Sequence, residues 1–500
     1  MAGLIGYGAY VPYHRLAREH IAAALGGPAG RGTRSVAGYD EDTTSMAVEA
    51  ARLVLGGGGG GGGSDGDDNV SDSLRTYVRQ LFFATAAPAY LDKTNATAVH
   101  AALALDRHVL AVDLAGAVRS GVGALVAGSE SAAPTMVLLS DVRTGRPGSA
   151  DESACGDGAA AFLFGGSGSS ESYPDSDPDR PVLAEVVAHD SVSDELLERW
   201  RLPGAVASRV WEERFAEDIY IGLAAEALGA ALARAGWDAA ELDHFAVAGL
   251  HGRACAAVRR TAGIRPEAVT PDLTGAIGNT GTAHPGILLA DVLDRAQPGE
   301  RIALVVLGDG VSVLLLRATE ALPAHRAVRS VAAQIAAGSA PMPYASFLSW
   351  RGMLDREPPR RPDPEPPYAP PAYRRNAWKY AFIGSRCEKC GARHLPVSRV
   401  CASCRSVDAM VDEPMEHVRG TVVTYTVDRL AFTPSPPMLV VVVDYDGGGR
   451  FRCQLTDATE ADAVVGARVE MTFRRTVTAG GVHNYFWKAR PLRGNRPTGD

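Results

Sequence analysis

The chain lacks several features that mark membrane, secreted and nucleic-acid-binding proteins. No apolar run approaches the roughly 18 to 20 residues that a membrane-spanning helix needs. The N-terminus has no basic segment followed by an apolar one, so we expect no secretory signal, no membrane and a cytoplasmic location. A net charge of -8 gives no general electrostatic reason to expect nucleic acid as a partner.

Cysteine is also scarce, with seven among 500 residues. Four of the seven fall in two Cys-x-x-Cys pairs, which favours a reduced metal site over a disulfide scaffold. The remaining composition, 46% hydrophobic and 22% charged, is that of a globular protein. A chain of this length suggests about two to four domains.

Two similar phrases divide the first part of the chain. Gly156-Asp157-Gly158 and Gly308-Asp309-Gly310 each lead into a continuous apolar run, which is typical of a strand buried on both faces. Comparable strand and helix signals precede both phrases. We therefore predict an α/β domain over 1–345 made of two duplicated halves, about 1–170 and 171–330, with reactive groups at the strand ends where the halves meet.

The composition changes sharply after this domain. Residues 346–372 are rich in proline and arginine, which favours an extended linker. A short helix and the cysteine pairs are expected in 373–410. Short alternating runs such as Met438 to Asp444 then predict a small β-barrel over 411–495.

The two cysteine pairs are separated by ten residues. Two such knuckles suit tetrahedral zinc, and four thiolates leave no open position for water, so we predict a structural zinc site. The alternative is four cysteines without metal. The predicted ligands are Cys387, Cys390, Cys401 and Cys404.

Several motifs carry a family resemblance over most of the chain. Through Pro88 to Lys93, Asp113 to Gly121, Gly249-Leu250-His251 and Gly278 to Gly281, residues 1 to about 320 resemble a 3-hydroxy-3-methylglutaryl-CoA synthase or β-ketoacyl-carrier-protein synthase III of the thiolase superfamily. The remainder, from about residue 346, resembles the zinc-ribbon and OB-fold domain that accompanies acyl-CoA thiolases.

The resemblance implies a layered αβαβα fold followed by a zinc ribbon and an OB-fold barrel. It also implies an acyl-CoA or acyl-carrier thioester as substrate, and a homodimer or a heteromer with a thiolase-like protein. His251 and Asn279 match the family histidine and asparagine that polarise a thioester carbonyl or stabilise an enolate. Each well-placed donor of this kind is worth about 3 to 4 kcal/mol.

Two positions depart from the family pattern. Val118 stands at the cysteine that forms the acyl-enzyme, and the acid/base glutamate falls near Ala86. A valine cannot form a thioester, so the acyl-cysteine mechanism is excluded. Catalysis through a distant thiol such as Cys155 needs a positioned base and a low thiol pKa, and we expect a buried, inert cysteine there.

Two hypotheses follow. The first is an acyl-CoA-dependent enzyme that forms or cleaves carbon-carbon bonds, of the Claisen or aldol type, without an acyl-cysteine, with His284 as candidate base. The alternative for His284 is a capping or packed residue. The second hypothesis is a non-catalytic acyl-CoA-binding scaffold subunit of a thiolase complex.

Two further sets of residues carry weaker signals. Ser120, the hydroxyl nearest the missing cysteine, is expected to hydrogen-bond at a helix N-terminus and not to act as a nucleophile. Four residues of the segment from Trp200 onward are candidates for the substrate wall or for contacts with coenzyme A phosphates: Trp200, Arg201, Trp211 and Arg214.

Overall fold

Nine strands form one continuous mixed sheet in this computed structural model, which describes all residues except 28–29, 57–73, 167–180, 358–363 and 494–500. The order of the strands is β11-β12-β13-β8-β1-β7-β6-β4-β5. The first half of the domain supplies β1 (Gly3–Tyr10), β4 (Gln80–Thr85), β5 (Leu110–Ala115), β6 (Thr135–Val142) and β7 (Asp157–Gly165). The second half supplies β8 (Ala184–Ser193), β11 (His244–Gly249), β12 (Arg301–Leu307) and β13 (Gly310–Ala318).

The pairing pattern confirms the duplication. In the first half, β1, β7 and β6 are antiparallel neighbours, and β6, β4 and β5 are parallel neighbours. In the second half, β8, β13 and β12 repeat the antiparallel pairs and β12 with β11 the parallel one. The place of a fifth strand is held by a parallel bridge between Phe245 and Val269. A single pair, Leu4 with Ala184, joins the two halves.

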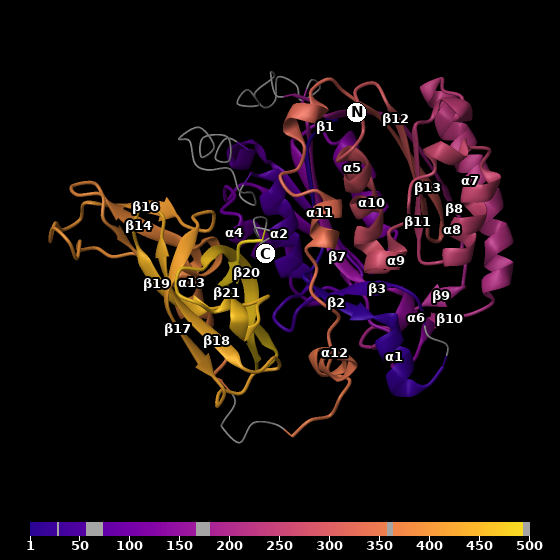
Figure 1. The fold of residues 1–500 in the computed structure, drawn as a ribbon. Helices are drawn as coiled ribbons and strands as arrows, with labels where there is room; N and C mark the ends of the chain where they lie inside the picture. Colours follow the sequence, from indigo (N-terminus) through magenta and orange to yellow (C-terminus); the bar gives the residue numbers. More distant parts are fainter. Residues whose placement is uncertain (28–29, 57–73, 167–180, 358–363, 494–500) are drawn as a thin grey trace, which may run out of the picture.

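Helices cover both outer faces of the sheet and fill the space between its halves (Figure 1). The outer layers are α2 (Thr43–Val54) with α4 (Ala96–Ala102), and α7 (Glu213–Ala235) with α8 (Gly252–Thr261). The central layer is α5 (Ser120–Glu130) with α10 (His284–Leu293), and α10 is apolar nearly all round because it is buried on every side. Alternate residues of β6 face different cores, Met136 toward α2 and Val137 toward α5. The predicted αβαβα layering is confirmed.

Shorter elements complete the first domain: β2 (His14–Ala17), α1 (Arg18–Leu25), β3 (Thr33–Val36), α6 (Ala150–Ala154), β9 (Arg199–Trp200), β10 (Arg209–Val210), α9 (Thr274–Ile277), α11 (Val331–Ala336) and α12 (Tyr344–Trp350). Helix α12 runs across the expected boundary at residue 345. Its Phe347 is fully buried against Leu16 and Val36, so chain that was expected in the linker packs on the first domain. Residues 358–363 of the linker lie outside the described residues.

The C-terminal part begins with α13 (Ala369–Arg374) and α14 (Asn376–Ala381). A small sheet of β14 (Ile383–Cys387), β15 (Arg393–His394) and β16 (Met410–Pro414) carries the cysteines. Five strands follow in the order β19-β18-β17-β20-β21: β17 (Gly420–Asp428), β18 (Met438–Tyr445), β19 (Arg450–Gln454), β20 (Arg468–Ala479) and β21 (Val482–Pro491). A bridge from Leu455 to Ala489 links the ends of the series, and alternate residues of β18 face inward, as expected for a small barrel.

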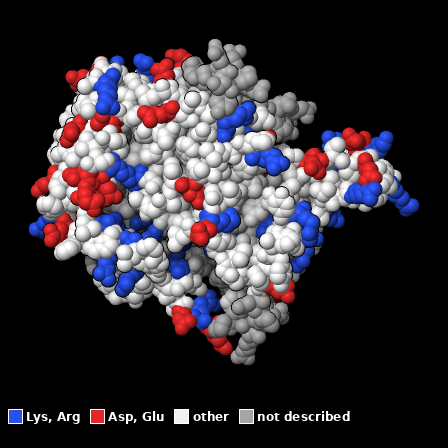
Figure 2. Space-filling view, turned by 180° about the vertical axis from the view of Figure 1, so that it is seen from behind, with Lys and Arg blue, Asp and Glu red and all other residues white. Residues whose placement is uncertain are grey.

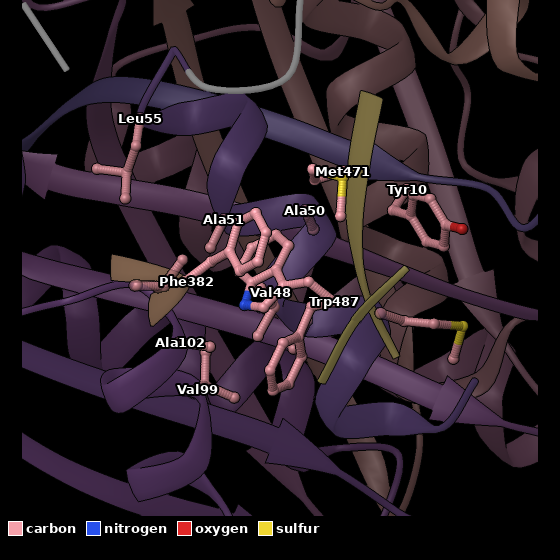
Figure 3. Packing of buried hydrophobic residues seen from close by; sticks show 14 of the residues in the cluster. Tyr10, Val48, Ala50, Ala51, Leu55, Val99, Ala102, Phe382, Met471 and Trp487 are labelled. Atoms are coloured by element: carbon pink, nitrogen blue, oxygen red, sulfur yellow. The ribbon is translucent and has the colours of Figure 1, made fainter. Parts of the chain in front are cut away.

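The barrel packs on the first domain through apolar side chains. Trp487, Phe382 and Met471 meet α2 and α4, where Val48 and Val99 lie in the same buried cluster (Figure 3). Trp487 and Phe382 are among the largest fully buried side chains. Because one core contains residues of both parts, the barrel is a fixed part of the molecule.

Buried ion pairs reinforce this interface. Arg474 Nη2 lies 2.6 Å from Asp457 Oδ2, and its Nη1 contacts Glu41. Lys488 Nζ lies 2.8 Å from Asp40 Oδ2. These groups are almost completely excluded from solvent. They connect the loop before α2 with strands of the barrel, and no sequence pattern had indicated them.

The surface carries charges of both signs. On the face shown in Figure 2, basic and acidic side chains are interspersed, including on the protruding lobe that holds the zinc ribbon. On that lobe Arg393 pairs with Glu413, and Arg399 with Asp408. Among the helices of the described residues, none combines the length and the apolar character needed to cross a membrane.

Candidate active site

A cavity of about 210 Å³ lies where the two halves of the first domain meet. Ala86 follows β4, Val118 follows β5, His251 follows β11 and Asp309 follows β12, so the carboxyl ends of four strands converge on it. The other lining residues are Gly116, Ala117, Arg119, Arg143, Glu198, Arg199, Trp200, Arg201, Ser208, Tyr220, Leu250, Leu307 and Gly308.

His251 is fixed by the backbone of the helix that it caps. Its Nδ1 accepts a hydrogen bond from the Ala254 N–H at 3.0 Å, and the Tyr220 ring meets its ring edge-on at 5.9 Å. The side chain is buried yet lines the cavity. Because Nδ1 is an acceptor, the neutral ring carries its proton on Nε2 and is a hydrogen-bond donor there.

Asn279 lies next to this site without lining the cavity. Its Nδ2 donates to the Gly249 carbonyl at 2.7 Å, and its Oδ1 accepts from the Gly281 N–H at 3.0 Å. Gly249 is two residues before His251, so the amide supports the strand end that presents the histidine. The structure therefore gives Asn279 a supporting place beside the cavity, and its action on a substrate oxygen stays a prediction.

His284 occupies a different environment. It is the first residue of α10, is 2% exposed, and its Nδ1 accepts from the Thr280 N–H at 3.3 Å. Burial lowers its pKa to about 4. It is not among the residues that line the cavity. Its assignment as a base stays a prediction that this geometry does not favour.

Val118 and Ala86 stand where the resemblance implies the cysteine and the glutamate of the family. Both residues line the cavity, as expected for positions that would meet the reacting atoms of a substrate. Cys155 is 4% exposed and outside the lining, and burial raises the pKa of its thiol. A thiolate there is therefore disfavoured. Ser120 is the first residue of α5, and the hydrogen bond expected from its side chain stays a prediction.

Sequence reasoning underrated two carboxylates of the cavity. Asp309, in the second Gly-Asp-Gly phrase, lines the cavity with a left-handed φ of 47°. Partial burial raises its pKa, which Arg119 opposes. Glu198 accepts a hydrogen bond from Tyr220 Oη at 3.0 Å. The matching Asp157 is fully buried and pairs with Arg34. The aspartates of the two identical Gly-Asp-Gly phrases therefore lie in different environments, one in the core and one in the cavity wall.

The candidate wall residues divide into two groups. Trp200 and Arg201 line the cavity. Trp211 is 58% exposed and packs edge-on to Trp200, with ring centroids 6.4 Å apart, in a neighbouring hollow. Arg214 is exposed. Only the first two residues are placed to contact a substrate in the cavity.

The four predicted zinc ligands come together. Their sulfur atoms all lie within 4.8 Å of one another, with Cys387 Sγ 3.7 Å from Cys404 Sγ and Cys390 Sγ 3.5 Å from Cys401 Sγ. A zinc tetrahedron with bonds of about 2.3 Å places its sulfurs about 3.8 Å apart, so the residues fit the metal. Figure 1 shows this ribbon, β14 and β16, at the opposite end of the molecule from β9 and β10.

Family models match three segments of the chain. Residues 232–317 match the C-terminal part of 3-oxoacyl-[acyl-carrier-protein] synthase III. Residues 379–410 match the rubredoxin-like zinc ribbon domain of ChsH2, and residues 413–474 match the C-terminal OB-fold domain of ChsH2. The chain thus joins a thiolase-type, hydroxymethylglutaryl-CoA synthase-like domain to a zinc ribbon and an OB-fold.

Relatives of known name are also similar to the first domain. The chain is 26% identical over 369 residues to the hydroxymethylglutaryl-CoA synthase of Methanothermobacter thermautotrophicus, covering 71% of this chain and 99% of the relative. It is 29% identical over 315 residues to that of Pyrococcus furiosus, covering 62% and 83%.

Solved structures show the same fold. The FabH synthase III of Pseudomonas aeruginosa covers 64% of this chain and 98% of its own at a TM-score of 0.52 and 22% identity. MvaS in complex with 3-hydroxy-3-methylglutaryl coenzyme A covers 73% and 94% at a TM-score of 0.56 and 20% identity.

Proposed function

We propose that the protein is an enzyme that forms or cleaves carbon-carbon bonds on acyl thioesters, of the Claisen or aldol type, without an acyl-cysteine intermediate. The observation that carries this proposal is one cavity that joins Val118, Ala86 and the oriented imidazole of His251. The site cannot hold a thioester at position 118, yet it keeps a donor for an enolate oxygen.

The chemistry needs an oxyanion donor and a base. Nε2–H of His251 donates to the thioester carbonyl oxygen as negative charge develops on it, and Asn279 acts through its hydrogen bond to Gly249, which supports the strand end that presents the histidine. Asp309 removes the α-proton, because it is a cavity carboxylate whose raised pKa brings it closer to neutral pH. The enolate carbon then attacks a carbonyl acceptor. In the aldol case the acceptor oxygen takes up the proton that Asp309 removed. In the Claisen case the acceptor is a second thioester, whose C–S bond breaks, and the thiol leaves with that proton. Cleavage is the reverse.

The names of similar proteins support acyl thioester chemistry. Relatives are hydroxymethylglutaryl-CoA synthases, and a structure with the same fold contains 3-hydroxy-3-methylglutaryl coenzyme A. A curacin-pathway HMG synthase of this fold, with a TM-score of 0.57 and 18% identity, is in complex with an acetyl donor carrier protein. Zinc would be held by the four cysteines and take no part in the reaction, since they complete its coordination.

The same cavity is compatible with a second role, an acyl-CoA-binding scaffold that serves a cysteine-bearing thiolase. The missing cysteine and glutamate favour it. A homodimer or a heteromer could form at the edge of the sheet. In the described part of the chain β5 is the last strand of the nine-stranded sheet, and its Leu110 is 54% exposed. We propose pairing there, with a second copy or with a thiolase-like protein.

Deuterium exchange tests the enzyme without knowledge of the acceptor. Acetyl-CoA and butyryl-CoA are incubated with the protein in D2O, and deuterium at the α-carbon is measured by mass spectrometry. We expect exchange by the native protein and a loss of about 10²- to 10³-fold in His251→Ala. The exposed His325→Ala is the matched control and should retain the native rate.

The scaffold gives the opposite pattern. Exchange and turnover would be absent with the protein alone, would appear only after a cysteine-bearing thiolase is added, and would survive His251→Ala. That result would refute the enzyme hypothesis.

A further inference from the structure

A second hollow, of about 230 Å³, lies beside the active-site cavity. Glu198 lines both, so the two spaces share part of a wall. Among the described residues, no lysine or arginine lines this hollow. Its walls include three large apolar side chains and three carboxylates: Leu197, Trp211, Phe215, Glu195, Glu198 and Glu212. We call it the acidic hollow.

The apolar side chains of the acidic hollow are exposed to solvent. Leu197 is 64% exposed and Phe215 is 66% exposed, and Trp211 is exposed beside them. The main chain that carries them is fixed, because the Trp211 N–H donates to the Glu198 carbonyl oxygen at 2.8 Å. Exposed apolar side chains that gather in one place with a polar rim are typical of a surface that binds another protein. The acidic hollow is therefore a preformed docking surface.

The charge around the acidic hollow restricts the partner. Residues 194–218, which supply its walls, contain seven acidic and four basic side chains. One of the four, Arg199, is paired with Asp151 at 2.8 Å, and the other three do not line the hollow. A partner that brings apolar side chains and positive charge matches this surface, because complementary charges favour the correct contact over others.

The barrel part of the chain carries a segment of the opposite character. Residues 366–385 contain three basic side chains and no aspartate or glutamate. Tyr373 is 83% exposed, and Tyr368 is also exposed. Arg374 and Arg375 are exposed as well, and among the ion pairs of the described residues none includes either of them. We call these four residues the basic strip.

The basic strip is firmly attached to the barrel. Trp378, on the next helix, packs its ring against Phe382, Phe451 and Phe486, with ring centroids 5.1 to 5.4 Å apart. In Figure 1 α13, which carries the strip, lies with the barrel, whereas α7, β9 and β10 lie on the other side of the molecule. The strip and the acidic hollow of one molecule therefore do not meet, and contact between them needs two molecules.

We propose that the basic strip of one copy of the chain docks on the acidic hollow of a second copy. Tyr373 packs on the exposed apolar side chains, and Arg374 and Arg375 pair with the glutamates of the hollow. Because the two surfaces differ, the contact is heterologous, and repetition of it builds a ring or an open chain of copies. It is separate from pairing at β5, and it places the barrel of one copy beside the active-site cavity of the next.

Sedimentation velocity of the full-length, zinc-loaded protein tests the proposal. We expect the average mass to rise with protein concentration between about 1 and 100 μM. Sodium chloride at about 0.5 M should weaken the association, because salt screens charges at the edge of an interface.

Charge reversal on each surface identifies the contact. One double variant, Glu195→Lys with Glu212→Lys, reverses the hollow, and another, Arg374→Glu with Arg375→Glu, reverses the strip. Each variant alone should associate at least about tenfold more weakly than the native protein, since like charges then meet. An equimolar mixture of the two should associate again, because each reversed surface finds its opposite on the other variant.

Matched controls separate this effect from a change in net charge or in folding. Glu226→Lys with Glu320→Lys makes the same change in net charge at exposed positions outside the hollow and should associate like the native protein. Circular dichroism and zinc content check that each variant is folded. Phe215→Ala keeps every charge and should weaken the association by about tenfold, so a reversed variant that fails to fold does not end the test.

Three outcomes overturn the proposal. The first is an average mass of the native protein that does not change with concentration. The second is association that persists unchanged in both reversed variants and in Phe215→Ala, which would assign it to another surface such as the edge at β5. The third is a mixture of the folded reversed variants that associates no better than either one alone.

Discussion

Replacement of Arg474 by methionine tests how the barrel is held on the first domain. Arg474 is fully buried, and it pairs with Asp457 and Glu41 from the two sides of the interface. Tyr10 Oη accepts a hydrogen bond from Arg474 Nη2 at 3.3 Å. Methionine fills much of the same volume but leaves the buried Glu41 without this ion pair and Asp457 with the weaker contact to His14 at 3.5 Å. Breaking a buried pair in this way costs about 3 to 5 kcal/mol.

The effect is measured by urea unfolding, followed by tryptophan fluorescence, because Trp487 is 1% exposed at the same interface. With a slope of about 3 kcal/mol per M, the midpoint of the transition that exposes Trp487 should fall by roughly 1 to 1.7 M in Arg474→Met. The matched control is Arg468→Met on the same strand, whose pair with Asp446 is 41% and 53% exposed. Exposed pairs contribute about 1 kcal/mol or less.

The protonation of Glu41 gives the prediction a pH dependence. Burial raises the pKa of Glu41 and the charge of Arg474 opposes this, so loss of the arginine raises the pKa further. A carboxyl group whose pKa is higher in the folded than in the unfolded protein lowers the stability of the fold as pH rises toward and through the folded pKa. The cost of Arg474→Met should therefore be larger at pH 8 than at pH 5. Equal small shifts for Arg474→Met and Arg468→Met would refute the reasoning.

Two further predictions concern acid stability and the metal. Burial would raise the pKa of Glu470, but Arg490 and Arg329 hold it at about 2, below its value of roughly 4.3 in an unfolded chain. Glu470 therefore stabilises the fold above about pH 4.5, and this contribution of about 3 kcal/mol is lost as pH falls through 2. In Glu470→Gln the free energy of unfolding, followed by circular dichroism, should depend less on pH in that window. An unchanged dependence on pH would contradict the role given to Glu470. Freshly purified protein should contain about one equivalent of zinc by elemental analysis, and Cys401→Ala should lose it, whereas Cys453→Ala, the buried thiol outside the cluster, should retain it.

Short sequence patterns predicted those parts of the molecule whose structure is set by residues close together in the sequence. The spacing of the four cysteines requires two tight turns and little else, so the zinc ribbon was visible in the sequence. The repeated Gly-Asp-Gly phrases indicated the duplicated halves, because a glycine turn before a buried strand is a local feature. Alternation in β18 indicated the barrel for the same reason.

The candidate site was only partly predictable. His251 was found through a motif, and Val118 and Ala86 through departures from it. Glu198 and Arg143 carry no such signal, since each belongs to a segment without a motif and reaches the cavity only when the halves close. For His284 the sequence left two readings open, a base or a packed residue, and its burial at the start of α10 favours the second.

By itself, the sequence determined the duplicated first domain, the zinc ribbon and the barrel, because each follows from residue type and short spacing; chemistry without an acyl-cysteine stays a prediction from the resemblance. The tertiary structure alone decided which charges meet. Asp40 and Lys488 are 448 residues apart and form a buried pair, and the Arg201 guanidinium contacts the backbone of Ala86 across 115 residues. Such contacts depend on the packing of whole layers, which brings side chains together without a local signal in either segment.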